Sequence, residues 1–315
     1  MKILVTGGAG FIGSHLADRL LSEGHDILVV DNYATGRRDN LTPHANLRVF
    51  EGSIVDKELV DLAFEYFKPE YVVHAAASYK DPTNWLEDSL TNVVGTVNVV
   101  KASQRHNVKR LIYFQTALCY GLKPLQQPIQ PDHPYFASTY SGGSSYAISK
   151  IGAELYIELS GLDFISFRLA NVYGPRNVSG PLPTFYQRLT NNKPCFVADT
   201  RRDFIFIDNI VEVVVKALNG KGQKGYYNIS TGSDYAIKEL FDDVVVALGI
   251  TLGHEVEVKP RTEDDTFTIL IDNTRTCRDF DWEPKGTLKE GIAKTIEWYK
   301  THTIENTYTH LKKMD

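Results

Sequence analysis

Three polar side chains have types and positions that could support proton transfer. Tyr146 and Lys150 stand four residues apart at the start of a predicted helix, so a phenol and an ammonium face one pocket. A nearby cation lowers the pKa of a phenol, which lets a tyrosine act as a base near neutral pH. Thr116 ends a predicted strand, where its hydroxyl could share the reacting proton. Each feature taken alone also fits a structural role, as an aromatic anchor, a solvated lysine and a strand-end threonine.

A glycine-rich turn near the N-terminus indicates a dinucleotide site. Gly7, Gly10 and Gly13 recur every three residues between a predicted strand and a predicted helix. The first permits a tight turn, the second lets the backbone approach a pyrophosphate, and the third lets helix and sheet pack closely. Asp31 ends the next strand, roughly 20 residues on, where an acid binds ribose hydroxyls and would repel a 2′-phosphate. We therefore expect NAD rather than NADP, with the arginines after Asp31 on a solvated loop.

The apolar pattern predicts the elements that position these groups. Short runs rich in β-branched and aromatic residues alternate with amphipathic stretches of helical spacing. Strands are predicted at Lys2–Thr6, His25–Asp31, Leu47–Ser53, Tyr71–Ala77, Arg110–Thr116 and Phe164–Val172, and helices at Ser14–Glu23, Asp56–Phe67, Ser89–His106 and Ser145–Leu159. This alternation predicts an α/β fold with a Rossmann-type, doubly wound parallel sheet, which binds ligands at the carboxyl ends of its strands.

The regular alternation of strands and helices ends after Val172, where the predicted elements are shorter and Pro and Gly residues separate them. We expect residues 1–172 to form the NAD-binding domain and residues 173–315 mainly a smaller α/β domain for the substrate, with some chain returning to the sheet. The predicted elements of this second part are strands at Phe204–Ile207, Tyr226–Ser230 and Thr268–Asp272 and helices at Ile237–Leu248 and Leu288–Lys300. Residues 121–145 are predicted to form a long loop beside the site.

The composition argues against several classes of protein. Hydrophobic residues make up 43% and charged residues 23% of the 315 residues, and no apolar run is long enough to cross a bilayer. A net charge of −5 provides no basic field for nucleic acid, and the nine histidines show no metal-ligand spacing. Cys119, Cys195 and Cys277 fit reduced thiols better than a disulfide framework. We expect a cytoplasmic enzyme without a metal site.

Several motifs occur in the order seen in extended short-chain dehydrogenases. They are the glycine-rich turn, Asp31, His74-Ala75-Ala76-Ala77, Thr116 with Tyr120-Gly121, the Tyr146/Lys150 pair and Arg168-Leu169-Ala170-Asn171. Within that superfamily the chain resembles NAD-dependent sugar-nucleotide epimerases of the UDP-galactose 4-epimerase type, especially epimerase-like proteins of bacterial O-antigen operons. This narrower likeness rests on residues 115–121 and on the segment from Pro175 to Pro183.

The resemblance implies a reversible oxidation at the sugar C4. Tyr146, supported by Lys150, would take the proton of the 4-hydroxyl while C4 passes a hydride to NAD, and Thr116 would bind the reacting hydroxyl. The 4-keto sugar would then rotate and regain the hydride on its other face. The expected cofactor contacts are Gly7, Gly10, Phe11, Ile12, Gly13, Asp31, Asn32, Thr35, Gly36, Ser53, Ile54, His74, Ala75, Ala76, Tyr146 and Lys150. Ser53 departs from relatives that often have an aspartate for the adenine amino group.

The resemblance also implies where a nucleotide-sugar substrate, with UDP favoured, would bind. Expected contacts are Lys80, Thr116, Asn171 and the diphosphate-binding Arg202, with Arg261 and Asp265 as weaker candidates because their spacing departs from the family's Arg-Pro-Gly-Asp stretch. Related 4,6-dehydratases place acids directly after the catalytic threonine, and UDP-glucuronate decarboxylases place a glutamate in the same stretch. Ala117 and Leu118 occupy these positions here and cannot transfer protons, which argues against both reactions.

Epimerisation for surface polysaccharide (O-antigen, lipopolysaccharide) synthesis is thus the expected function, and two alternatives stay open. The same catalytic trio could serve a net C4 dehydrogenase or reductase if the cofactor exchanged freely. A non-catalytic NAD-binding regulator is a second alternative, since a dinucleotide fold alone does not establish chemistry. The resemblance further implies a homodimer, since proteins of this family commonly dimerise through two helices of each subunit, here Ser89–His106 and Ser145–Leu159.

Overall fold

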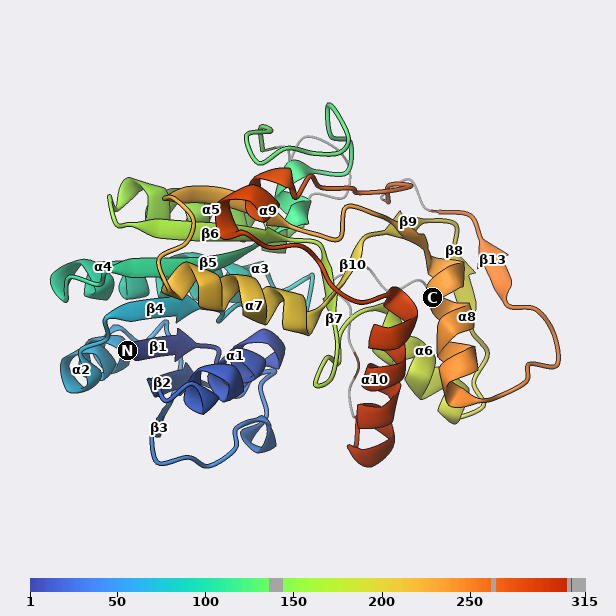
Figure 1. The fold of residues 1–315 in the computed structure, drawn as a ribbon, viewed down its shortest axis with the longest axis horizontal. Coiled ribbons are helices and arrows are strands. Elements are labelled where there is room, and N and C mark those ends of the chain that lie inside the picture. The colour runs from blue at the N-terminus through green and yellow to red at the C-terminus, as the bar shows by residue number, and fades with distance from the viewer. Residues whose placement is uncertain (136–143, 262–264, 305–306, 308–315) are drawn as a thin grey trace.

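A parallel sheet of seven strands forms the centre of the fold (Figure 1). The computed structural model describes residues 1–135, 144–261, 265–304 and 307. The strand order is β11-β6-β5-β4-β1-β2-β3, and every pairing in this sheet is parallel. The strands are β1 (Lys2–Thr6), β2 (Asp26–Asp31), β3 (Leu47–Glu51), β4 (Tyr71–His74), β5 (Arg110–Thr116), β6 (Phe164–Leu169) and β11 (Gly225–Ile229). The predicted doubly wound α/β fold is confirmed, and its strand order reverses between β1 and β4, where such sheets bind ligands.

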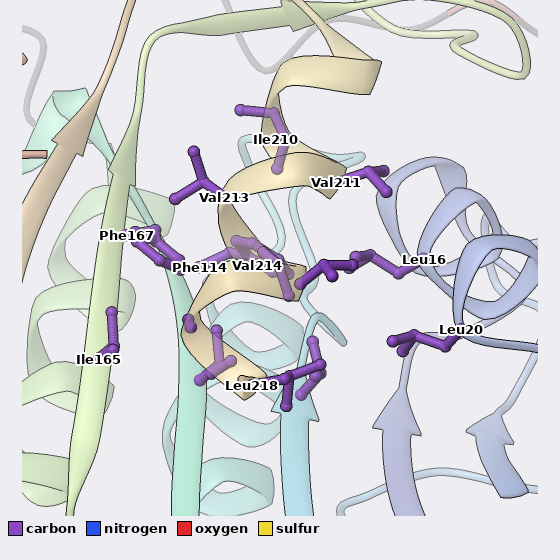
Figure 2. Close-up of a cluster of buried hydrophobic side chains, with 14 of the residues drawn as sticks. Leu16, Leu20, Phe114, Ile165, Phe167, Ile210, Val211, Val213, Val214 and Leu218 are labelled. Carbon is purple, nitrogen blue, oxygen red and sulfur yellow. The ribbon is translucent and has the colours of Figure 1, made fainter. Parts of the chain in front are cut away.

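Helices cover both faces of the sheet. One face carries α1 (Phe11–Ser22), α7 (Ile207–Leu218) and α9 (Thr274–Phe280), and the other carries α2 (Lys57–Phe67), α4 (Thr96–Arg105) and α5 (Ser145–Leu159). Figure 2 shows the first interface, where Val213 and Val214 of α7 pack near Phe114 and Phe167 of the sheet, with Leu16 of α1 beside them. Most residues of α7 are apolar and lie buried between the sheet and its neighbours, whereas Asp208, Glu212 and Lys216 lie on its more accessible side.

The chain after β6 builds a smaller part beside the sheet (Figure 1). Its elements are β7 (Asn171–Tyr173), α6 (Pro181–Thr190), β8 (Phe196–Ala198), β9 (Arg201–Arg202), β10 (Phe204–Phe206), β12 (Tyr235–Ala236), α8 (Ile237–Leu248), β13 (Glu257–Lys259) and α10 (Leu288–Thr301). The strands pair as β10 with β7, β12 with β9 and β13 with β8. Phe185, Phe241 and Ile292 lie in the core between α6, α8 and α10. The chain returns to the main sheet through α7 and β11, the strand expected at Tyr226–Ser230.

The helix expected over Ser89–His106 is divided. The segment consists of the π-helical η2 (Ser89–Gly95) and then α4, and the short α3 (Trp85–Asp88) leads directly into it. Asn92 lies in the wider π turn, and its Nδ2 donates to Ser149 Oγ of α5 at 2.9 Å. Such turns depend on tertiary contacts of this kind and often occur at functional sites, whereas apolar spacing shows only that a helix is present.

The strand expected over Phe164–Val172 is also two elements. The Ala170 amide still donates to the Ile229 carbonyl of the main sheet at 3.0 Å, whereas the Asn171 amide donates to the Asp203 carbonyl at 3.0 Å. The chain therefore leaves the sheet at Ala170 and pairs with β10 as β7. A continuous apolar run cannot indicate such a change of partner.

The strand expected over Thr268–Asp272 is not formed. This segment makes only an isolated bridge between Ile129 and Ile271. The Asp272 amide donates to the Ile129 carbonyl, and the Ile129 amide donates to the Leu270 carbonyl, both at 2.8 Å. Its apolar residues are buried against the segment after β5, so they resemble a strand in sequence without joining a sheet.

Smaller differences concern element ends and helices that the pattern did not indicate. The first helix begins at Phe11 rather than Ser14, because the glycine-rich turn leads directly into it. The strand expected over Phe204–Ile207 ends at Phe206, since Ile207 begins α7. The sequence pattern did not indicate α6, α7 or α9. Among the described residues, no helix is both long and apolar enough to span a membrane.

Candidate active site

A cleft of about 570 Å³ lies at the carboxyl ends of the strands, lined from both the sheet and the smaller part. The expected site residues that line it are Gly7, Gly10, Phe11, Ile12, Gly13, Asp31, Asn32, Thr35, Gly36, Ser53, Ile54, Ala75, Ala76, Lys80, Thr116, Tyr146, Lys150 and Asn171. His74, Arg202, Arg261 and Asp265 are not among the described residues that line it. The structure thus brings together the three expected catalytic residues and nearly all expected cofactor contacts.

The glycine-rich turn leaves no space for side chains. Gly7 has a φ of +66°, and a Cβ there would lie 2.6 Å from the Ala76 amide nitrogen. A Cβ at Gly13 would lie 2.2 Å from the Gly7 carbonyl oxygen. Gly10 provides no side-chain cap for α1, so backbone amides at the start of this helix, next to the cleft, can meet an anion. This cradle fits a dinucleotide pyrophosphate.

Asp31 is fixed against this turn. Its Oδ2 accepts the Ala9 amide at 2.8 Å, and its Oδ1 accepts the Tyr33 amide at 2.7 Å. Burial raises the pKa of the carboxyl, and these two hydrogen bonds oppose the rise. The nearby arginines are paired with acids, Arg37 with Asp39 and Arg38 with Glu51, each at 2.6 Å. A ribose 2′-phosphate would therefore meet a carboxylate, with both guanidinium groups already paired.

Thr116, Tyr146 and Lys150 all line the cleft. Burial lowers the pKa of Lys150 to about 7. Burial, with smaller contributions from Tyr79 and Asp88, raises the pKa of Tyr146. The lowering of the phenol pKa that we expected from Lys150 is therefore not seen. Burial is the largest effect on this phenol.

Hydrogen bonds hold α5, which carries Tyr146 and Lys150, in place. Gln115 Nε2 donates to the Lys150 carbonyl at 2.9 Å, and Ser149 Oγ donates to the Tyr146 carbonyl at 2.9 Å. Asn92 of the π-helical turn donates to the same serine hydroxyl. The sequence patterns indicated no role for these polar residues. Gln115 and Ser149 lie within the motifs around Thr116 and Tyr146, whereas Asn92 lies only within a predicted helix.

His74, the buried last residue of β4, lies behind the cleft lining. The Thr96 hydroxyl donates to the Asn92 carbonyl at 2.6 Å, so it can only accept from His74 Nε2, which lies 2.8 Å from it. The Nε2 of His74 therefore carries the proton, and its Nδ1 accepts from Thr6 Oγ1 at 2.6 Å. Burial lowers the pKa of His74 to about 3, with Lys150 adding to the effect. The Thr6 hydroxyl also accepts the Ala76 amide at 3.2 Å. The neutral imidazole therefore fixes the strand end behind the cleft.

The expected substrate residues fall into two groups. Lys80, Thr116 and Asn171 line the cleft, and Asn171 Nδ2 donates to the Asp203 carbonyl at 3.2 Å. Arg202 instead forms an ion pair with Asp265 and donates to the Thr266 carbonyl at 3.1 Å. The guanidinium of Arg261 lies 5.8 Å from the centre of the Phe267 ring. Arg202, Arg261 and Asp265 thus lie outside the cleft lining.

The cleft also contains residues to which the sequence assigned no role. Additional polar lining is provided by Asn84, Glu87, Thr91, Arg176, Asn177 and Ser179. The last three lie in the segment from Pro175 to Pro183, so the motif that carried the narrower resemblance was the available signal. Arg176 also forms an ion pair with Asp18 of α1 at 2.7 Å, which ties this segment to the dinucleotide side. The described residues contain no group of three or more His, Cys, Asp or Glu side chains placed to hold a metal ion.

The family described as "NAD dependent epimerase/dehydratase family" matches residues 3–230. The chain belongs to this family. This membership confirms the resemblance inferred from the motifs and the cofactor expected from the glycine-rich turn and Asp31. The UDP-glucose 4-epimerase of Mycolicibacterium smegmatis is 34% identical over 323 residues, covering 95% of this chain and 99% of the relative.

Solved structures of two Bordetella bronchiseptica enzymes are also similar to this family member. WbmH, in complex with NAD+, is 50% identical with a TM-score of 0.91, covering 95% of this chain and 98% of that chain. WbmG, in complex with NAD and UDP, is 44% identical with a TM-score of 0.90, covering 99% of both chains.

Proposed function

We propose that this chain interconverts nucleotide sugars that differ in configuration at C4. The observation that carries the proposal is the convergence of Thr116, Tyr146 and Lys150 on a cleft shared with the glycine-rich turn. Bound NAD would supply a hydride acceptor that later returns the hydride to the sugar. The absence of side chains at Gly7 and Gly13 and the carboxylate of Asp31 support NAD as the resident cofactor.

The protein's own part in the reaction is proton transfer and orientation. Tyr146 removes the proton of the sugar 4-hydroxyl and returns it after the 4-keto sugar has rotated. Thr116 binds the reacting oxygen, and the Lys150 ammonium stabilises the phenolate. Because burial raises the pKa of Tyr146, base catalysis requires positive charge close to the phenol.

The residues after Thr116 favour epimerisation over elimination or decarboxylation. Ala117 and Leu118 lie in the short 3₁₀ helix η3 (Ala117–Tyr120), and the Leu118 amide donates to the Thr116 hydroxyl at 3.2 Å. Neither side chain can exchange a proton. A general acid at these positions is what dehydration of the sugar would require.

A UDP-linked sugar is the proposed substrate class, with a role in O-antigen synthesis. The WbmG complex with NAD and UDP supports a uridine nucleotide, and Asn171 and Arg202 are the proposed contacts for the nucleotide sugar. Since Arg202 is paired with Asp265, a diphosphate would have to replace or join this carboxylate. Lys80 remains a proposed phosphate contact at the cleft wall.

We further propose a cytoplasmic homodimer. The exposed apolar residues of α5 are Ile148, Leu155, Tyr156 and Leu159, spaced as one face of a helix, and Val94 of η2 is exposed nearby. An apolar row of this kind is expected to be covered by another protein surface. The same two elements from a second copy would form the four-helix contact expected from the sequence.

The experiment that tests the proposed reaction needs no added cofactor. Purified protein is incubated with UDP-glucose, UDP-galactose and their N-acetylamino counterparts, and NMR follows the C4 epimer. We expect conversion by the wild type, and a Tyr146→Phe variant that retains NAD but loses turnover. Tyr66→Phe, on the exposed face of α2, is the control that keeps activity. Stoichiometric accumulation of NADH and a keto sugar would instead favour a net C4 dehydrogenase.

A further inference from the structure

A buried ion pair lies behind the catalytic face of α5. Glu154 Oε2 is 3.0 Å from Arg168 Nη2, and Glu154 Oε1 is 3.3 Å from Arg168 Nε. The two side chains are 0% and 2% exposed. Removing two charges from water costs several kcal/mol per ion unless their geometry and additional hydrogen bonds compensate. The proposed proton transfer at Tyr146 uses neither residue directly.

Additional hydrogen bonds connect this pair to three segments of the chain. Arg168 Nη1 donates to the Pro131 carbonyl and Nη2 to the Tyr135 hydroxyl, both at 2.7 Å. The Tyr135 hydroxyl donates to Glu154 Oε2 at 2.8 Å, and the Ser166 hydroxyl donates to Glu154 Oε1. The pair therefore joins α5, β6 and the segment that follows η3.

Glu154 lies one helical turn beyond Lys150 and two turns beyond Tyr146, so all three residues share one side of α5. Lys150 Nζ lies 3.9 Å from the centre of the Tyr113 ring, and its carbonyl accepts the Tyr113 hydroxyl at 3.2 Å. Burial lowers the pKa of Lys150, and the negative charge of Glu154 opposes that effect. Glu154 is thus the acidic neighbour of an otherwise desolvated ammonium.

We propose that Glu154, locked by Arg168, is a positioning residue for the reaction: it fixes the orientation of α5 and supplies the counter-charge that keeps Lys150 an ammonium. This inference rests on the proposed epimerase function, in which the charged form of Lys150 supports Tyr146. Arg168 contacts both oxygens of the carboxylate, which prevents Glu154 from turning away.

Other titratable groups surround these residues. Lys150 stands four residues from both Tyr146 and Glu154 on α5, and its other neighbours are Tyr113 of β5 and His74 of β4. Glu154 faces Arg168, Tyr120, Tyr135, Cys119 and Tyr226. Burial raises the pKa of each of these tyrosines and of the cysteine, so they stay neutral near pH 7. The low pKa of His74 likewise keeps it neutral. Glu154 and Arg168 are therefore the charged groups next to Lys150 in this cluster.

The test is the Glu154→Gln variant, which keeps the shape of the side chain and removes its charge. Without that charge the pKa of Lys150 falls, so the alkaline limb of the pH profile of kcat/KM moves about half a pH unit or more toward acid. NMR titration of protein labelled at the lysine ε-carbon, with Lys150→Arg used to identify the signal, measures the same shift without turnover. Tyr135→Phe is the control, because it removes a hydrogen bond to Glu154 but no charge. In this variant we expect the alkaline limb of the kcat/KM profile and the Lys150 titration to stay at their wild-type positions.

The outcomes separate this inference from the proposed function. One outcome is that Glu154→Gln leaves the alkaline limb of the kcat/KM profile and the Lys150 titration at their wild-type positions and reduces activity equally at every pH. That result would show a purely structural role for Glu154 and overturn the inference. A shifted titration in a protein without epimerase activity would retain the charge role and reject the proposed function. If Glu154→Gln does not fold, the double variant Glu154→Gln/Arg168→Gln leaves no unpaired charge. Because it loses a positive charge together with the negative charge that acts on Lys150, we expect a smaller acid shift of the Lys150 titration than in the single variant, and no shift would overturn the inference.

Discussion

The Asp31 carboxylate accepts a hydrogen bond from the Ala9 amide at 2.8 Å, which joins the end of β2 to the glycine-rich turn. Asp31→Ser should weaken NAD binding about ten- to a hundredfold, because hydrogen bonds to a charged group contribute about 1.5–3 kcal/mol. Discrimination against NADP should fall as well. Calorimetric titration of cofactor-depleted protein checks both. The control Asp26→Ser changes an exposed acid at the start of the same strand. Unchanged NAD affinity in Asp31→Ser would remove Asp31 from the cofactor site.

Gly13→Ala should destabilise the protein and weaken NAD binding. The added Cβ would lie 2.2 Å from the Gly7 carbonyl oxygen, so the turn or α1 must shift. Overpacking of this kind typically costs about 1–3 kcal/mol. Thermal unfolding with and without NAD measures the loss of stability and of the NAD-induced rise in Tm. Gly253→Ala is the control, because its Cβ would have no heavy atom within 4 Å. Equal melting behaviour of the two variants would contradict the close approach.

The buried His74 should make stability depend on pH. Its pKa in the folded protein is about 3, against an ordinary value of 6.5. The unfolded chain therefore binds a proton that the folded chain does not, and stability is lost as pH falls from about 6.5 to about 3. The free energy of unfolding should fall by up to about 1.4 kcal/mol per pH unit from this residue.

Chemical unfolding of wild type and His74→Gln across this pH range isolates the effect. The variant is less stable at neutral pH, because the glutamine replaces well-formed hydrogen bonds to Thr6 and Thr96. We expect the difference in free energy of unfolding between the wild type and His74→Gln to become smaller as the pH falls, because only the wild type loses the contribution of a neutral His74. His254→Gln, an exposed position, is measured in parallel. A difference that stays constant from pH 6.5 to 3 would mean that His74 protonates normally in the folded protein.

The apolar row on α5 should mediate dimerisation. Leu159 is 78% exposed, and Leu159→Glu places a charge in the proposed contact, so the dimer should dissociate to a monomer. Light scattering during size-exclusion chromatography measures the mass. Leu62→Glu, on exposed α2, should leave the dimer intact. A wild-type monomer, or a dimer unaffected by Leu159→Glu, would place the contact elsewhere or exclude it.

Much of the central sheet could be predicted because its signals are local. Gly7, Gly13 and Asp31 stand at fixed distances around one strand–turn–helix unit, and continuous β-branched runs reveal buried parallel strands. Thr116 and Lys150 were expected beside one cleft, and both line it, since β5 ends and α5 begins at the same edge of the sheet. These inferences needed only the order of elements and their periodicity.

Features set by contacts between distant segments were not predictable. The π turn that carries Asn92 and the departure from the sheet at Ala170 depend on partners more than 30 residues away. The pairing of Arg202 with Asp265 likewise joins residues 63 positions apart. The raised pKa of Tyr146 arises from burial, which helical spacing cannot report.

The most direct measurement of the proposed reaction follows a deuterium label at the sugar C4. UDP-galactose carrying deuterium at C4 is incubated with the wild-type protein, and NMR and mass spectrometry locate the label in the product. We predict UDP-glucose, or the epimer of whichever UDP-sugar is accepted, with the deuterium still bound to C4, because the same hydride leaves and returns. Loss of the label to solvent, or inversion without any transfer from C4, would contradict a reaction that proceeds through hydride transfer to a retained cofactor.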